Sequence, residues 1–142
     1  MSRWVSTLVM IMIAAPVVIH ADDDIPNLKG TWVADMSAIR TEVPKEYGPQ
    51  PLASCKPGPC RLSVKYVIDM QDGTIFSGTK HSPSVNQTVI GVIDLNSRTV
   101  HMVDQKGFIF GELINPDKIH LTFLENTQHG QVAALGFMIR QP

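Results

Sequence analysis

The chain has no run of lysine or arginine that would form a basic patch. Proteins that bind nucleic acid usually carry such patches, so this absence argues against a nucleic-acid partner. Charged residues make up only 18% of the 142 residues, and twelve basic side chains nearly balance thirteen acidic ones. The charge pattern therefore points to no polyanionic partner.

The sequence also lacks a recognisable catalytic or metal-binding motif. No Gly-x-Ser-x-Gly sequence occurs, and Ser82 and Ser84 lie beside His81 in a stretch typical of a solvated loop. His101 and His120 fall in predicted strands that are two connections apart, which does not favour shared metal ligation. We therefore expect a non-enzymatic protein with no metal and no cofactor.

Long apolar runs are scarce, and the exception lies near the N-terminus. Arg3 precedes an apolar stretch over residues 8–19, and Ala21 is followed by three aspartates. This layout predicts a secretory signal over residues 1–21, too short for a comfortable membrane span. The remaining 121 residues suit one domain, residues 22–142, with eleven basic and thirteen acidic side chains. We expect an exported protein, periplasmic or secreted, with no stable membrane insertion after cleavage.

Only two cysteines are present, Cys55 and Cys60, and they flank a Pro-Gly-Pro turn. Export to an oxidising compartment and the tight turn together predict a disulfide between them. A redox pair would more usually be Cys-x-x-Cys, and a zinc site would need further ligands nearby. The pair lies in a proline-rich stretch, residues 37–61, which we expect to form a long loop.

Most of the remaining chain consists of short apolar runs separated by turn signals such as Gln71-Asp72-Gly73. Eight strands are predicted, over residues 28–36, 62–70, 74–80, 88–95, 98–104, 108–114, 118–124 and 131–139. Glycines inside four of these strands (Gly78, Gly91, Gly111, Gly136) favour bending and closure of the sheet. The prediction is an all-β, eight-stranded, antiparallel up-and-down barrel.

The faces of the predicted strands are less clearly defined than their number. The bulky candidates for the interior are Tyr66, Met70, Phe76, Phe108, Phe110, Phe123 and Phe137. Glu112 shares a face with Phe110, so if that face points outward, Gly111 and Leu113 fill the interior instead. Residues 89–95 and 132–139 are apolar on both faces and need cover from a partner subunit or the long loop. We therefore expect self-association.

Residues 28–32 have the sequence Leu-Lys-Gly-Thr-Trp, and Arg140 ends the last predicted strand. These features resemble the calycin group of barrels, which includes lipocalins, avidins and small periplasmic protease inhibitors. The resemblance implies that Gly30 and Trp32 close one barrel end and that Arg140 packs across the indole.

The avidin comparison fails at the ligand-binding positions. Avidins carry an asparagine two residues after the tryptophan, where this chain has Ala34, so biotin binding is not expected. The stretches 90–94 and 103–104 also resemble small exported bacterial proteins of unknown function.

The leading hypothesis is an exported binding protein whose partner is an unidentified small molecule or protein. Loops on a rigid barrel commonly carry recognition, so contacts are predicted for His81, Ser82, Ser84, Asn86 and Gln87, and for residues 37–61. One alternative is a protease inhibitor that presents residues 22–27. A second is a small barrel enzyme acting on a hydrophobic substrate, which requires a hollow interior.

Overall fold

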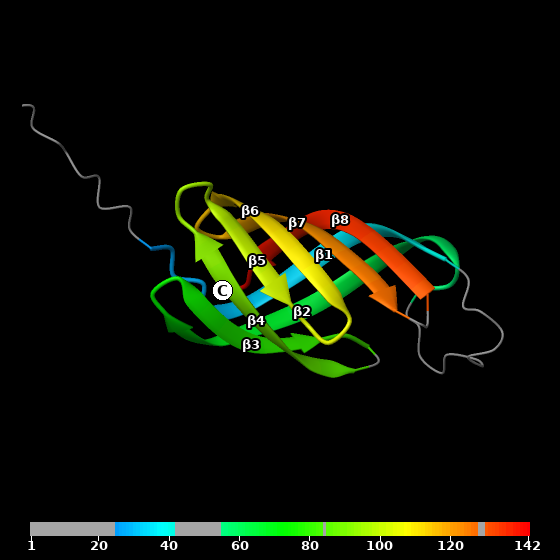
Figure 1. Cartoon of the computed structure of the whole chain (residues 1–142), viewed down its shortest axis with the longest axis horizontal. Coiled ribbons are helices and arrows are strands. Elements are labelled where there is room, and N and C mark those ends of the chain that lie inside the picture. Colours follow the sequence, from blue (N-terminus) through cyan, green and yellow to red (C-terminus); the bar gives the residue numbers. More distant parts are fainter. Residues whose placement is uncertain (1–24, 42–54, 84, 128–129) are drawn as a thin grey trace, which may run out of the picture.

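The computed structural model describes residues 25–41, 55–83, 85–127 and 130–142, which form a barrel of eight strands (Figure 1). The strands are β1 (Gly30–Arg40), β2 (Gly58–Asp72), β3 (Ile75–His81), β4 (Asn86–Asp94), β5 (Thr99–Val103), β6 (Gly107–Asn115), β7 (Lys118–Thr127) and β8 (Gly130–Arg140). Each strand pairs antiparallel with the next, and β1 also pairs with β8, from Trp32 opposite Arg140 to Arg40 opposite Val132. The predicted all-β, up-and-down closed barrel is confirmed.

The predicted loop over residues 37–61 is too long at both ends. β1 continues to Arg40, which lies opposite Gly58, the first residue of β2. Residues 37–40 and 58–61 are therefore strand, and the connection runs only from residue 41 to residue 57. Prolines are tolerated in the first residues of a strand, which explains why Pro59 did not prevent pairing.

The disulfide predicted between Cys55 and Cys60 is confirmed, with Cα atoms 5.8 Å apart. Cys60 lies in β2 opposite Ala38, whereas Cys55 precedes the strand and is buried. The bond therefore ties the end of the long connection to the β1–β2 ladder.

The barrel interior is packed with apolar side chains. Trp32, Tyr66 and Phe76 are each at most 2% exposed, and they project inward from β1, β2 and β3. Ile109 and Leu121 fill the opposite wall from β6 and β7. This packing leaves the ends of the barrel, rather than its middle, as the places where a ligand would find space.

Four of the seven bulky side chains predicted to be inside lie outside instead. These are Met70, Phe108, Phe110 and Phe137. In β6 the interior positions are taken by Gly111 and Leu113, as the alternative assignment of Glu112 to the outer face required. Gly111 is needed there because an added Cβ would lie only 2.7 Å from Cγ2 of Ile119. For Met70 the reason is an irregularity in the β2–β3 ladder just before it, which shifts the alternation.

Trp32 and Arg140 lie together at one end of the barrel. The guanidinium carbon of Arg140 is 4.2 Å from the Trp32 ring centroid, a distance that favours cation–π attraction. The indole Nε1 donates a 2.8 Å hydrogen bond to the carbonyl oxygen of Leu28. Gly30, at φ +128°, leaves room for this arrangement, because a Cβ there would lie 3.2 Å from Nη1 of Arg140.

The same arginine also fastens neighbouring segments to the barrel end. Its guanidinium donates hydrogen bonds to the carbonyl oxygens of Asn27, Lys29 and Pro116, at 2.5, 2.5 and 3.0 Å. Its Nε lies 2.8 Å from a carboxylate oxygen of Asp117. Arg140 thus joins the segment before β1 to the β6–β7 turn, and all of its guanidinium nitrogens have partners.

Candidate functional site

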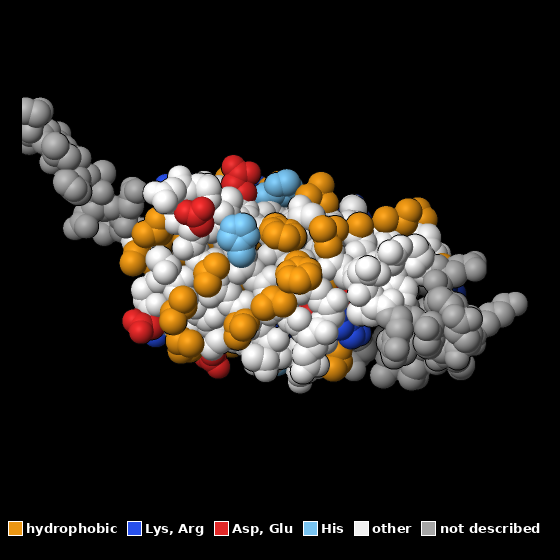
Figure 2. Space-filling view, viewed as in Figure 1, with side chains coloured by type: hydrophobic (Ala, Val, Ile, Leu, Met, Phe, Trp, Pro, Cys, Tyr) orange, Lys and Arg blue, Asp and Glu red, His pale blue; other side chains and the backbone are white. Residues whose placement is uncertain are grey.

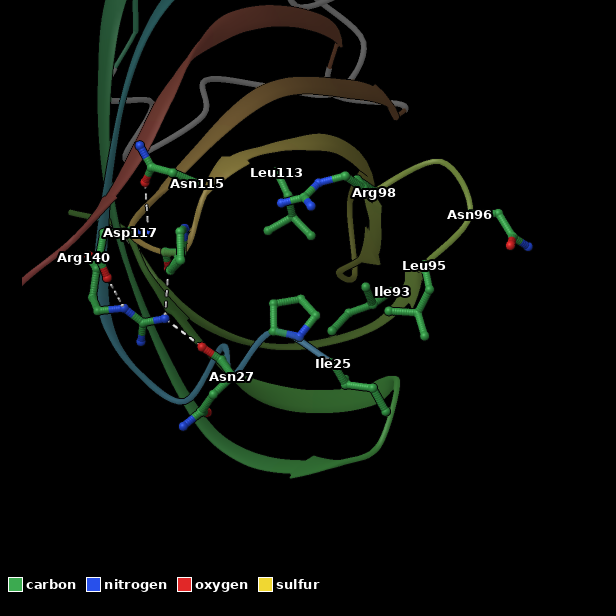
Figure 3. Close-up of a pocket in the computed structure, with 12 residues that line it drawn as sticks. Ile25, Asn27, Ile93, Leu95, Asn96, Arg98, Leu113, Asn115, Asp117 and Arg140 are labelled. Atoms are coloured by element: carbon green, nitrogen blue, oxygen red, sulfur yellow. Dashed lines mark hydrogen bonds and ion pairs between the residues drawn. The ribbon is translucent and has the colours of Figure 1, made fainter. Parts of the chain in front are cut away.

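A cavity of about 870 Å³ opens at the barrel end that holds Arg140, and we call it the end cavity (Figure 3). It is lined by Ile25, Pro26, Asn27, Ile93, Leu95, Asn96, Arg98, Leu113, Asn115, Pro116, Asp117 and Arg140. Ile93 and Leu113 are inward-facing residues at the ends of β4 and β6, so they form the floor where the packed interior begins. The volume falls within the range of roughly 300–1,000 Å³ that is usual for small-molecule sites.

The segment preceding β1 crosses this end of the barrel and forms one wall of the cavity (Figure 3). Gln71 holds it in place, because its side-chain oxygen accepts from the Leu28 amide at 2.7 Å and its Nε2 donates to the Pro26 carbonyl at 2.9 Å. Asn27 is bound on the other side by Arg140. The cavity wall is therefore fixed by side chains from both β2 and β8.

The turn between β4 and β5 forms the opposite rim and is organised by Asp94. Its carboxylate accepts from the Asn96 amide at 3.0 Å and from the Ser97 hydroxyl at 2.7 Å. The hydrogen bond from Ser97 is the main reason that the pKa of Asp94 lies below its usual value. Because these contacts fix the turn, they also fix the position of the next residue, Arg98.

Arg98 has a backbone φ of +54°, in the left-handed region that favours glycine or asparagine, unlike the other non-glycine residues of the described part. Its carbonyl oxygen accepts a 2.9 Å hydrogen bond from the amide of Leu113 in β6. Figure 3 shows its side chain extending across the cavity toward Leu113. Within the described ranges the Arg98 guanidinium has no hydrogen-bond or ion-pair partner, which sets it apart from Arg140.

A second group of polar side chains lies inside the barrel, and we call it the interior polar cluster: Tyr66, Lys80, Gln87 and Asp104. Nζ of Lys80 lies 2.5 Å from Oδ2 of Asp104 and 4.3 Å from the Phe123 ring centroid. The other carboxylate oxygen accepts from the amides of the β5–β6 turn at 2.8 and 3.0 Å. Burial, and to a lesser degree the Asp104 carboxylate, raises the pKa of the Tyr66 hydroxyl well above its usual value.

The predicted contact residues between β3 and β4 are joined in part by hydrogen bonds within the loop, and their role in recognition stays a prediction. His81 Nδ1 lies 2.9 Å from Oδ1 of Asn86, and the Ser82 hydroxyl donates to the Val85 carbonyl at 2.9 Å. Gln87 is instead 5% exposed and belongs to the interior polar cluster. Ser84 lies outside the described residues, as do most of the residues predicted as the long contact loop and residues 22–24 of the inhibitor arm.

The two strand histidines, His101 and His120, lie on the outside of the barrel. Each ring contacts a different phenylalanine. His101 meets the edge of Phe110, with ring centroids 5.9 Å apart, and His120 packs on Phe137 at 5.0 Å. Among the described residues, no group of three His, Cys, Asp or Glu side chains is placed to hold a metal ion.

An apolar surface covers the outside of β3–β6 and the end of β2, and we call it the outer apolar face (Figure 2). Its most exposed members are Met70, Ile75, Ile90, Val92, Phe108 and Phe110, each at least 44% exposed. They line a shallow groove of about 490 Å³ to which no Lys, Arg, Asp or Glu contributes. Exposed apolar surface of this kind marks interaction sites, and self-association through it stays a prediction.

Sequence reasoning missed both the end cavity and the interior polar cluster. The end cavity is assembled from four separate parts of the sequence, residues 25–27, 93–98, 113–117 and Arg140, so no local pattern reveals it. The one available signal was Arg98, which follows Asn96-Ser97 in a turn where glycine is more usual. For the cluster, the signal was Lys80, which shares its face of β3 with Phe76 and Gly78.

Comparisons with protein-family models, with curated proteins and with solved structures each find no match. In the part of the chain that the structure describes, no helix has the length and hydropathy needed to cross a bilayer.

Proposed function

We propose that this chain is an exported, calycin-like binding protein that holds a small amphipathic molecule in the end cavity. The observation that carries the proposal is a cavity of about 870 Å³ whose floor is made by Ile93 and Leu113 and whose rim is polar. Ligand sites commonly combine an apolar lining with a few fixed polar groups.

The fixed position of the cavity walls supports a role in ligand binding. Gln71, Arg140 and Asp94 each fix one segment of the wall through side-chain hydrogen bonds. A cavity whose walls are already ordered loses little conformational entropy when a ligand enters, which favours affinity.

Two further observations support the finer parts of the proposal. The packing of Arg140 on Trp32 agrees with the calycin resemblance of residues 28–32. The disulfide between Cys55 and Cys60 agrees with export to an oxidising compartment.

The proposal can be tested with the neutral fluorescent probe N-phenyl-1-naphthylamine and the mature chain. We expect saturable binding, and Leu95→Gln should weaken it about fivefold, because part of an apolar side chain's burial, worth about 1 kcal/mol, is lost. Leu95 is half-buried at the cavity wall, so its replacement should leave the fold intact, which a thermal melt checks.

Phe108→Gln is the matched control, since it removes an apolar side chain from the outer apolar face instead. Probe binding should be unchanged by this substitution. If the probe does not bind saturably, the proposal is contradicted. It is also contradicted if Phe108→Gln weakens probe binding and Leu95→Gln does not.

A further inference from the structure

We infer that the ligand of the end cavity is an amphipathic monoanion, with its carboxylate held by Arg98 and its apolar part on Ile93 and Leu113. This inference rests on the proposed function and names the class of ligand. It is carried by the charges of the cavity, by a guanidinium without a partner among the described residues, and by the backbone that holds it.

The charges of the lining residues leave one positive charge without a partner. The lining contains two cations, Arg98 and Arg140, and one anion, Asp117. Asp117 is paired with Arg140 at 2.8 Å, and the remaining nitrogens of Arg140 donate to backbone carbonyls. A bound anion would therefore complete the charge balance of the cavity, whereas a bound cation would add to the excess.

Arg98 itself has the chemistry and the position for this role. A guanidinium presents a planar set of donors that matches a carboxylate in two parallel hydrogen bonds. Arg98 is exposed, so solvent screens its charge, and the two parallel hydrogen bonds supply most of the expected preference for a carboxylate. The nearest carboxylate along the chain, Asp94, already accepts from Asn96 and Ser97 and forms no ion pair with Arg98.

The backbone of Arg98 supplies an independent argument. A non-glycine residue in the left-handed region is held there against its own preference, and such residues gather at functional sites. Here the φ of +54° is fixed by the Asp94 turn and by the hydrogen bond from the Leu113 amide. The turn thus keeps a cationic side chain over the cavity at a position where glycine would fit more easily.

Displacement of N-phenyl-1-naphthylamine by decanoate, decan-1-ol and decyltrimethylammonium tests the inference, with the two ionic compounds below their micellar concentrations and the alcohol below its solubility limit. The three compounds carry ten-carbon chains with an anionic, a neutral and a cationic head group, and the comparison of decanoate with decan-1-ol decides the inference. For the unaltered chain we expect decanoate to bind about fivefold more tightly than decan-1-ol, with the cation weakest.

Arg98→Gln should remove the preference for decanoate while leaving decan-1-ol binding within twofold. Arg98→Lys should keep part of the preference for decanoate. A lysine retains the positive charge, but it cannot form the two parallel hydrogen bonds of a guanidinium. Arg61→Gln is the matched control, since Arg61 is exposed on β2 and does not line the cavity.

The outcomes separate the inference from the function on which it rests. If none of the probe or the decyl compounds binds, the proposed function fails and the inference fails with it. If decan-1-ol binds as tightly as decanoate, or Arg98→Gln leaves the preference unchanged, the inference is overturned and the binding function stands.

Discussion

Replacing Gly136 with alanine is expected to lower the free energy of unfolding by about 3 kcal/mol, a large fraction of the total stability of a domain of this size. Gly136 lies in β8 opposite Met36 of β1, on the ladder that closes the barrel. An added Cβ would overlap the carbonyl oxygen of Asp35 and come within 2.7 Å of the Met36 Cα. Both atoms belong to the backbone, so no side-chain movement relieves the overlap, and the two strands must separate.

Urea denaturation followed by circular dichroism measures this effect. Ala133→Val is the matched control, because Ala133 is exposed on the same strand and added methyl groups there face solvent. We expect this control to change stability by less than about 0.5 kcal/mol. Equal stability of Gly136→Ala and the unaltered chain would show that β1 and β8 do not approach each other as described.

Lys80→Met is expected to cost about 3–5 kcal/mol, the usual effect of leaving a buried charge without its partner. Lys80 and Asp104 form an ion pair with side-chain exposures of 8% and 0%. Without the ammonium, the Asp104 carboxylate stays inside the barrel and keeps only its hydrogen bonds from the β5–β6 turn. The methionine fills a similar volume, so the loss reports the charge rather than a cavity.

The double variant Lys80→Met, Asp104→Asn should recover a large part of the lost stability. The amide oxygen of an asparagine can still accept from the turn, while no buried charge remains. Lys118→Met is the matched single control, because Nζ of Lys118 also lies over a phenyl ring, 4.1 Å from Phe137, but on the outer surface. A loss for Lys118→Met as large as for Lys80→Met would contradict a special role for the buried pair.

The number and order of strands could be predicted because turn residues separate every pair of apolar runs from residue 62 onward. The direction in which side chains point could not be predicted wherever both faces are apolar. In β6 the alternatives were Phe108 and Phe110 inside, or Gly111 and Leu113 inside, and only Glu112, on the face of Phe110, bore on the choice. The choice depends on the space beside Gly111, which Ile119 of a different strand occupies.

The candidate site was harder to predict than the barrel, for a related reason. In the sequence Arg98 stands out only as a non-glycine residue after Asn96-Ser97 in a turn, and Leu113 is an ordinary apolar residue of a strand. Their relation arises only when β4, β5 and β6 pair and the segment before β1 is drawn over the barrel end by Gln71 and Arg140. The contact loop between β3 and β4 was predicted because its residues are polar. One of these residues, Gln87, is buried and faces the barrel interior.

The account depends most on the end cavity as the binding site, and an amide chemical-shift titration of the mature chain with decanoate tests that directly. We predict that the largest shifts fall at Ile25, at residues 93–98 and at residues 113–117, the segments that line the cavity. Shifts concentrated instead around Ile90 and Phe108 would place the ligand on the outer apolar face and contradict the account.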